Sequence, residues 1–491
     1  MRVDHDSTGG GAESGRMDDY ITIEDISAMN PAEISARFRA GGIPFPREVE
    51  DQVRAIVDDV ARRGDAALFE HTIRFDGWDL SSPSVTARPL SGPGPHSPGS
   101  RSALESGPAV SRKGTVRVDG AQIEEYSRGV VPAVSLALDV AVERVKRFHE
   151  REIEGDRFGG WIYIDELGNR VGKRTVPIER VGIYIPGGKA SYPSTLVMTA
   201  VPALVAGVGE IALISPPASF APPSPLCLAV KKIGGIADVF RVGGVQGIAA
   251  LALGTETIRK VDKIVGPGNI YVAAAKKLLY GAVDIDMIAG PSEVLIIADG
   301  SVDPVLAAVD LMAQAEHDEN ARAVCVTWSK KHALDVRDAL AGLLASSERR
   351  EIVEKALRRS GRIYVVKDEE CALALANGFG PEHLEIQTAR PEDLLGGVRH
   401  AGAVFMGKNT AEAFGDYLAG PSHVLPTSGT ARFFSPLSVL TFLKFSSVIE
   451  ISDRGLGALG EHAACLAEAE GLHEHARSVA FRLKDKGKRG K

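Results

Sequence analysis

The sequence predicts an α/β protein built from two parallel-sheet, incomplete Rossmann-like domains with helical extensions at both ends. Short apolar runs alternate with segments of helical periodicity, which is typical of βαβ units. This alternation occurs in two series, over about 176–298 and 304–406, and two series indicate two sheets. No predicted strand is followed by the Gly-x-Gly-x-x-Gly fingerprint of a complete dinucleotide-binding fold. We expect a first α/β domain over 49–183 plus 295–437 and a second over 184–294.

Three further segments differ in composition from these domains. The polar, Gly- and Ser-rich residues 1–18 predict a disordered tail, and the amphipathic pattern of 19–48 predicts a helical N-terminal extension. Between 81 and 114, 20 of 34 residues are Pro, Gly or Ser, so we expect a disordered insertion in the first domain. Residues 438–491 return to helical periodicity and predict a helical C-terminal tail.

Composition and charge exclude several classes of protein. The chain has 491 residues, with 57 basic and 64 acidic side chains, so its formal net charge is 57 − 64 = −7. Because nucleic-acid and anionic-membrane binders carry a basic excess, we expect no nucleic-acid and no membrane partner. The weakly charged stretch 190–230 contains seven prolines, which favours buried core over a bilayer span. The four cysteines are widely spaced and no signal peptide is visible, which predicts a reduced, cytoplasmic protein.

Glycine-rich turns follow three of the predicted strands, at 185–188, 242–244 and 266–269. In open α/β sheets ligands bind at the carboxyl ends of the strands, and helix N-termini there favour anions. These turns are therefore consistent with a nucleotide site. They are equally consistent with tight strand-to-helix connections that have only a structural role.

Side chains that suit a divalent metal occur in three separate segments. Gln314 and His317 are three residues apart at the end of a predicted helix, so they share a face. Asp416 lies in a turn-rich loop, and His475 lies near the C-terminus. Amide oxygen, imidazole and carboxylate suit Zn²⁺ or a similar ion. Helix ends and turns use the same residue types structurally, and spacing alone does not bring these segments together.

A carboxyl and an imidazole are adjacent at Glu382 and His383, directly after a Gly-Pro turn. Such a pair could transfer protons at neutral pH. Ser292 occupies another Gly-Pro turn, where a serine can contact a ligand or simply cap the turn. His423 ends the turn-rich loop that contains Asp416.

Taken together, these segments resemble the histidinol dehydrogenase family. The motifs occur in the family's order and span about 176–482, and several are long and unusual. The strings that carry the resemblance are VGIYIPGG at 181–188, GGVQGIAAL at 243–251, VDKIVGPGN at 261–269, DMIAGPSEVLIIA at 286–298, AQAEHD at 313–318, GPEHLEI at 380–386 and GDYLAGPSHVLPT at 415–427.

The resemblance implies an NAD-dependent, zinc-dependent, four-electron oxidation of L-histidinol to L-histidine through L-histidinaldehyde, the last steps of histidine biosynthesis. It also implies one Zn²⁺ per subunit, NAD bound by 184–294, and a homodimer whose C-terminal tail contributes to the partner subunit's site. By match to the family's motifs, the catalytic residues are Glu382 and His383; the metal ligands are Gln314, His317, Asp416 and His475; the NAD contacts are Tyr184, Gln246 and Asn269; and the substrate contacts are Ser292, Gln314, His317, His383, Asp416, His423, Glu470 and His475.

The implied roles suit the residue types. His383 can remove the hydroxyl proton as hydride leaves, and Glu382 can activate the water that adds to the aldehyde. Three alternatives stay open from the residues alone. The chain could be a zinc hydrolase that uses Glu382 to activate water, an enzyme that oxidises a related amino alcohol, or a non-catalytic metal- or nucleotide-binding protein.

Overall fold

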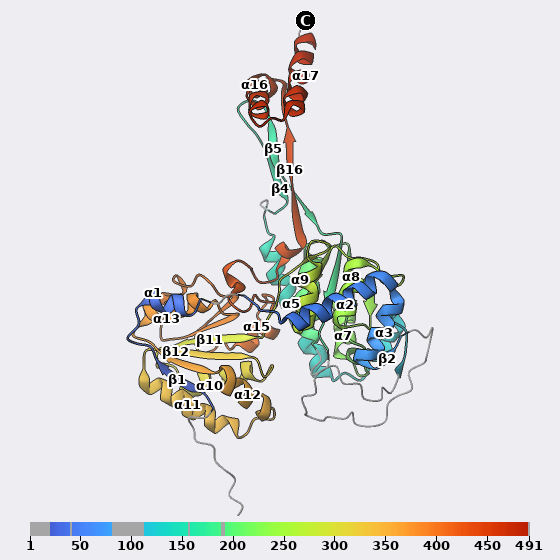
Figure 1. Ribbon diagram of the computed structural model, residues 1–491. Coiled ribbons are helices and arrows are strands. Elements are labelled where there is room, and N and C mark those ends of the chain that lie inside the picture. The colour runs from blue at the N-terminus through green and yellow to red at the C-terminus, as the bar shows by residue number, and fades with distance from the viewer. Residues whose placement is uncertain (1–19, 40–41, 81–111, 156–157, 188–191, 490–491) are drawn as a thin grey trace, which may run out of the picture.

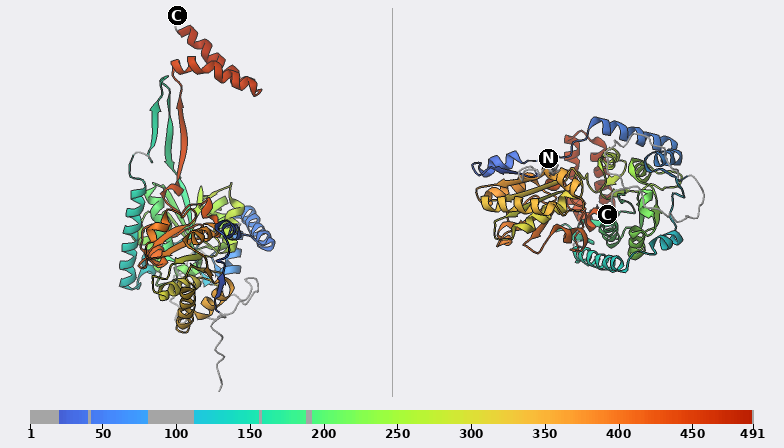
Figure 2. Two further views of the ribbon diagram at one scale, coloured as in Figure 1. Left: turned by 90° about the vertical axis from the view of Figure 1, so that its left-hand side faces the viewer. Right: turned by 90° about the horizontal axis from the view of Figure 1, so that it is seen from below.

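Two parallel sheets form the core of two α/β domains that lie side by side, and a long arm projects away from both (Figures 1 and 2). The computed structural model describes residues 20–39, 42–80, 112–155, 158–187 and 192–489. The predicted α/β class is confirmed, because every strand pair in both large sheets is parallel.

The six-stranded sheet forms the first domain. Its strands, in spatial order, are β1 (Thr22–Asp25), β13 (Arg362–Val365), β12 (Arg322–Thr327), β11 (Glu293–Ala298), β14 (His383–Gln387) and β15 (Ala403–Met406). The central strand β11 is buried along its whole length, as expected for a parallel strand covered by helices on both faces. One face packs against α10 (Pro304–Ala315), α11 (Lys330–Leu344) and α12 (Arg350–Ser360), and the other against α1 (Pro31–Arg37), α13 (Glu369–Phe379) and α14 (Pro391–Leu395).

The five-stranded sheet forms the second domain. Its strands, in spatial order, are β10 (Asp284–Ile285), β9 (Lys263–Val265), β6 (Arg180–Tyr184), β7 (Glu210–Ile214) and β8 (Asp238–Phe240). One hydrophobic cluster joins the sheet to α4 (Gly120–Ser127), α5 (Pro132–Glu152), α6 (Pro193–Val205) and α7 (Pro225–Ile233). A second cluster joins it to α2 (Arg47–Arg63), α3 (Asp65–Asp76), α8 (Gly244–Leu253) and α9 (Ile270–Leu279).

This packing differs from the domain boundary expected from the sequence. Residues 49–183 were assigned to the first domain, but α2, α3 and α5 within them pack on the five-stranded sheet. Amphipathic helices show which of their faces is buried and do not show against which sheet, so periodicity alone did not place them. The extension 19–48 also differs from expectation, because it is not only helical. It contributes β1, which pairs with β13 at the edge of the six-stranded sheet.

The arm is a three-stranded antiparallel sheet that carries two helices at its far end (Figure 1). The strands, in spatial order, are β16 (Leu443–Glu450), β5 (Arg170–Pro177) and β4 (Gly160–Ile164), and the helices are α16 (Asp453–Ala469) and α17 (His473–Arg489). The predicted helical tail 438–491 therefore contains a short 3₁₀ helix, Val439–Phe442, and a strand before its two long helices. The residues of β16 are mostly exposed and do not alternate between buried and exposed positions, because this sheet has no buried face of its own, so the sequence carries only a weak strand signal.

A few remaining elements connect the domains. They are β2 (Trp78–Asp79), β3 (Arg112–Lys113), α15 (Glu412–Tyr417) and the short 3₁₀ helices Pro217–Phe220, Thr430–Arg432 and Val439–Phe442. The predicted disordered tail 1–18 and most of the predicted insertion 81–114 lie outside the described residues. All four cysteines are free thiols. Among the described helices, none has the length and apolar character that crossing a bilayer requires.

Candidate active site

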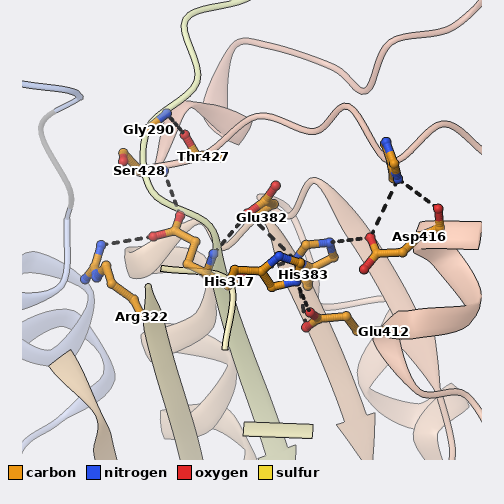
Figure 3. Close-up of polar contacts among 11 residues, drawn as sticks. Gly290, His317, Arg322, Glu382, His383, Glu412, Asp416, Thr427 and Ser428 are labelled. Carbon is orange, nitrogen blue, oxygen red and sulfur yellow. Dashed lines mark hydrogen bonds and ion pairs between the residues drawn. The ribbon is translucent and has the colours of Figure 1, made fainter. Parts of the chain in front are cut away.

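The predicted catalytic pair lies at the amino ends of two neighbouring strands of the six-stranded sheet. His383 is the first residue of β14, Glu382 directly precedes it, and Glu293 is the first residue of β11. Val294 pairs with His383 in the β11–β14 register, so Glu293 and Glu382 are brought alongside each other. Figure 3 shows His383, His317, Glu412 and Asp416 converging beside these strand ends.

His383 is held in one tautomer by the main chain. Its Nδ1 lies 3.1 Å from the carbonyl oxygen of Glu293, which can only accept, so Nδ1 carries the hydrogen. Nε2 is then an acceptor, 4.0 Å from Oδ1 of Asp416. Burial lowers the pKa of His383 to about 4, an effect that the Asp416 charge opposes. The imidazole is therefore neutral at physiological pH and offers a lone pair toward the polar cluster.

Glu382 is buried against the same main chain. Its Oε2 accepts a hydrogen bond of 2.9 Å from the N–H of Glu293 and lies 3.8 Å from Nδ1 of His383. Burial raises the pKa of Glu382 well above its usual range, and the hydrogen bond from Glu293 opposes that rise. A carboxyl group with a raised pKa is a stronger base once ionised, as proton transfer near neutral pH requires.

Three groups that can bind a metal meet next to His383. Single donor atoms of His317, Glu412 and Asp416 all lie within 4.8 Å of one another. Glu412 and Asp416 come from adjacent turns of α15, and His317 follows α10, with its Nε2 3.9 Å from Oε1 of Glu412. Imidazole and carboxylate donors at this spacing fit Zn²⁺.

Gln314 completes the donor set from the last turn of α10. Its side chain is fully buried, and with its amide nitrogen facing Glu412 it donates to the two carboxylate oxygens at 3.1 and 3.2 Å. The amide oxygen is the atom of Gln314 that could bind a cation. The structure therefore brings together three of the four predicted metal ligands, Gln314, His317 and Asp416.

Glu412 was not predicted from the sequence. Its main-chain N–H donates to Oε1 of Glu385 at 3.0 Å, and burial raises the pKa of the Glu412 carboxyl well above its usual range. A signal was available, because Glu412 and Asp416 are four residues apart and share a helix face. The sequence did not show that this face is buried against Gln314, since α15 is only six residues long.

His423 connects this cluster to the second domain. Its Nδ1 lies 2.8 Å from the carbonyl oxygen of Asp416, and its Nε2 lies 3.1 Å from Oγ1 of Thr195 in the first turn of α6. Because α6 follows β6, Thr195 stands at the carboxyl edge of the five-stranded sheet. The site therefore lies where the amino edge of one sheet meets the carboxyl edge of the other.

Ser292 lies in the turn that leads into β11. Its carbonyl oxygen accepts the N–H of Arg322 at 3.0 Å, and its side chain is half-buried. The N–H of Gly290 in the same turn donates to Oγ1 of Thr427 at 2.6 Å. Ser292 is thus placed directly before Glu293, beside the predicted catalytic pair.

The predicted NAD contacts gather at the carboxyl edge of the five-stranded sheet. Tyr184 ends β6, Gln246 lies in the first turn of α8, and Asn269 caps α9. Both amide atoms of Gln246 are buried without a hydrogen-bond partner among the described residues. Buried polar groups are costly unless a partner satisfies them, so this pair of atoms fits a bound polar ligand such as NAD.

The backbone at this edge allows close approach. Gly266 has a φ of +112°, and a Cβ at this position would lie 2.1 Å from the carbonyl oxygen of Tyr184. The phenol oxygen of Tyr184 accepts the N–H of Gly244, and burial raises the pKa of that phenol. Oδ1 of Asn269 accepts from two main-chain N–H groups at 3.1 Å, which leaves its amide nitrogen for a ligand.

The structure does not bring Glu470 and His475 to this site within one chain. Glu470 ends α16 and His475 lies in the first turn of α17, at the far end of the arm (Figures 1 and 2). Both side chains are exposed there.

Comparisons with known proteins identify the family of this chain. The family model for histidinol dehydrogenase matches residues 104–483. The chain is 45% identical over 454 residues to the histidinol dehydrogenase of Syntrophotalea carbinolica, covering 92% of this chain and 97% of the relative. It is 44% identical over 438 residues to that of Aquifex aeolicus, covering 89% of this chain and 93% of the relative.

Comparison of three-dimensional structures identifies the same family. The crystal structure of histidinol dehydrogenase from Elizabethkingia anophelis superposes with a TM-score of 0.80 at 30% identity, and the match covers 95% of this chain and 99% of that one. Both the sequence and the three-dimensional structure thus match one family across nearly the whole chain. The chain therefore belongs to the histidinol dehydrogenase family, oxidoreductases of histidine biosynthesis.

Proposed function

We propose that this chain catalyses the NAD-dependent, zinc-dependent, four-electron oxidation of L-histidinol to L-histidine through L-histidinaldehyde. The observation that carries the proposal is the placement of His383. Its unprotonated Nε2 faces the cluster of Asp416, His317 and Glu412, so it could take a proton from an alcohol held beside that cluster. A zinc ion in that cluster would fix the alcohol and increase its acidity.

His383 is the proposed base of the first oxidation. Nε2 accepts the hydroxyl proton while the carbonyl oxygen of Glu293 continues to accept from Nδ1, so the ring does not rotate during the transfer. The neighbouring Asp416 carboxylate stabilises the resulting imidazolium. NAD supplies the hydride acceptor, and Tyr184, Gln246 and Asn269 would hold it at the edge of the five-stranded sheet.

Glu382 is the proposed base of the second oxidation. The aldehyde must add water before it can lose a second hydride, and a carboxylate beside His383 can take a proton from that water. The N–H of Glu293 holds Oε2 of Glu382 at 2.9 Å and supports its ionised form. Glu382 and His383 therefore divide the proton transfers between water and alcohol.

Gln314, His317 and Asp416 would bind the zinc ion, and the partner subunit's His475 would complete the set. We propose a homodimer in which the arm reaches the partner's site, where the partner subunit's Glu470 would bind substrate beside Ser292 and His423. The arm supports this arrangement because its sheet exposes a row of large apolar side chains, which mark an interaction surface. These side chains are Trp161, Ile162, Tyr163, Ile164, Phe445 and Ile449.

L-Histidinol is the proposed substrate, and no nucleic acid or membrane takes part. Free thiols throughout the described cysteines agree with a proposed cytoplasmic location.

The test is an assay of the purified, zinc-loaded protein with L-histidinol and NAD⁺, followed by NADH absorbance. We expect close to two NADH for each histidinol, since each hydride carries two electrons. Removing zinc with a chelator is expected to abolish turnover, and adding zinc back to restore it. No NADH from fully loaded protein would overturn the proposal and favour a zinc hydrolase, and turnover only with another amino alcohol would reassign the substrate.

A further inference from the structure

Glu293 occupies a central position that the proposed reaction does not use directly. Its side chain is completely buried at the start of β11. Oε1 accepts a hydrogen bond of 2.7 Å from the N–H of Ser428, and Oε2 accepts one of 3.1 Å from Nη1 of Arg322. One carboxylate thus joins the beginning of β11 to β12 and to the loop at 427–429 (Figure 3).

The main chain of the same residue holds both proposed catalytic side chains. Its N–H donates to Oε2 of Glu382 at 2.9 Å, and its carbonyl oxygen accepts from Nδ1 of His383 at 3.1 Å. A displacement of Glu293 would therefore move Glu382 and His383 together. A shift of about 1 Å in such groups can slow a reaction by roughly a hundredfold.

The loop held by the carboxylate has a strained conformation. Ser428 has a φ of +55°, and it is the one described non-glycine residue with a positive φ. Residues with a side chain are unfavourable in this left-handed region, so surrounding contacts must hold Ser428 there. The contacts that hold this loop include the hydrogen bond from the N–H of Ser428 to Glu293, the bond from Gly290 to Thr427, and the turn bonds that Thr430 donates to the carbonyl oxygen of Thr427.

Two contacts fix the position of Arg322, the ion-pair partner of the Glu293 carboxylate. Its guanidinium lies 4.1 Å from the ring centre of Phe379, and its main-chain N–H donates to the carbonyl oxygen of Ser292. Burial raises the pKa of Glu293 to about 7, and the charge of Arg322 opposes that rise. Arg322 therefore favours the ionised form, which accepts both hydrogen bonds.

We propose that Glu293, paired with Arg322, is a positioning residue that holds the strained loop at Ser428 and thereby fixes the main chain that orients Glu382 and His383. The inference rests on the proposed roles of Glu382 and His383. Glu293 itself contacts neither the expected metal donors nor the NAD edge, so its loss should change turnover and leave both binding steps in place.

The experiment compares the wild type with Glu293→Gln and with the double variant Glu293→Gln/Ser428→Gly. We expect Glu293→Gln to lower kcat roughly 10- to 100-fold, while KM for histidinol changes less than about threefold. A glutamine amide has one acceptor oxygen and one donor group, so it cannot accept from Ser428 and Arg322 together, and the link between the loop and Arg322 is broken. Glycine accepts a φ of +55° without strain, so Ser428→Gly should recover part of the lost kcat. Ser428→Gly alone is the reference for that recovery.

Two measurements separate positioning from simple destabilisation. Zinc content and NADH affinity should match the wild type in each variant, and Glu392→Gln, an exposed glutamate of the same domain, is the matched control. If Glu293→Gln does not fold, Arg322→Gln breaks the same ion pair from its partly exposed side. A kcat within about twofold of wild type in folded Glu293→Gln, or no recovery in the double variant, would overturn the inference.

A readout without turnover distinguishes this inference from the proposed function. Hydrogen exchange of a peptide covering 424–432, measured by mass spectrometry, should be faster in Glu293→Gln than in the wild type. Faster exchange with no histidinol oxidation in the wild type would overturn the proposed function and leave the loop contact intact. Unchanged exchange in an active enzyme would overturn the positioning role alone.

Discussion

With its amide nitrogen turned toward Glu412, Gln314 donates to both carboxylate oxygens of Glu412, at 3.1 and 3.2 Å. This contact determines which end of the amide faces the cluster of His317 and Asp416. Only the oxygen of an amide binds a zinc ion, so the orientation set by Glu412 decides whether Gln314 is a ligand. Neighbours that orient ligands in this way typically change metal affinity by 10- to 100-fold.

Replacing Glu412 with alanine is therefore expected to weaken zinc binding about 10- to 100-fold, because the donor cluster loses a carboxylate and Gln314 loses the acceptor that orients it. The measurement is competition for zinc against a chromophoric chelator, which does not depend on turnover. Glu316→Ala is the matched control, since Glu316 is an exposed glutamate beside the same helix. A wild-type zinc affinity in Glu412→Ala would show that the amide is oriented by other contacts.

Replacing His383 with asparagine should slow the oxidation of histidinol by about 10² to 10⁴, the usual contribution of a general base. The asparagine amide can still donate to the carbonyl oxygen of Glu293, so the local main chain is preserved. Zinc content should stay at the wild-type value, because His383 is not among the proposed ligands. Loss of zinc from the purified variant would instead identify His383 as a ligand.

The effect of pH on stability can be tested at Asp76, the last residue of α3. Its Oδ2 is buried without a hydrogen-bond partner among the described residues, and burial raises the pKa of this carboxyl to about 6. Between about pH 4 and 6, the Asp76 carboxyl is therefore still protonated in the folded state, whereas it is already ionised in the unfolded state. Stability is lost as pH rises through that range, because ionising a buried carboxyl is unfavourable.

Asp76→Asn removes this ionisation and should be more stable than the wild type above pH 6, by about 1–3 kcal/mol. Near pH 4 the two proteins should be nearly equal, because Asp76 is then protonated. Thermal unfolding at several pH values between 4.5 and 8 measures the difference in Tm. A difference that does not grow with pH would show that Asp76 is ionised in the folded protein without penalty.

Much of the fold could be predicted because apolar residues form short continuous runs in buried parallel strands and recur every three to four residues in the helices between them. The buried strand β11 is a continuous apolar run, and the turns that follow β6 and β9 are marked by glycine. The sheet that each helix covers could not be predicted. The strand β1 could not be predicted either. It has only four residues, and it is a strand because it pairs with β13, which lies more than 300 residues later in the sequence.

The site residues were predicted because whole motifs resemble those of a known family. The spacing of residues along a helix accounts for only some of their contacts. Gln314 and His317 share a helix end, so their proximity follows from helical geometry. Asp416 reaches them through the folding of α15 against α10, which no local pattern indicates. Glu293 and Glu412 were missed because their roles depend on burial, and a glutamate in sequence usually indicates an exposed position.

The arm provides the sharpest test of the proposed dimer. His317 lies in the body of the chain and His475 lies at the far end of the arm, so the two belong to different sites of one dimer if the arms are exchanged. His317→Ala and His475→Ala should each be inactive and low in zinc. A mixed dimer of the two variants contains one site with both substitutions and one site with neither.

Coexpressing the two variants with different affinity tags, and purifying through both tags, isolates that mixed dimer. It should regain about half of the wild-type turnover per dimer and bind one zinc ion tightly, since one of its two sites is intact. Mixing His317→Ala with Gln314→Ala is the matched control. Both ligands then come from the body of their own chain, so each site keeps one defect and no activity returns. Equal recovery in both mixtures, or recovery in neither, would mean that the arm does not complete the partner's site.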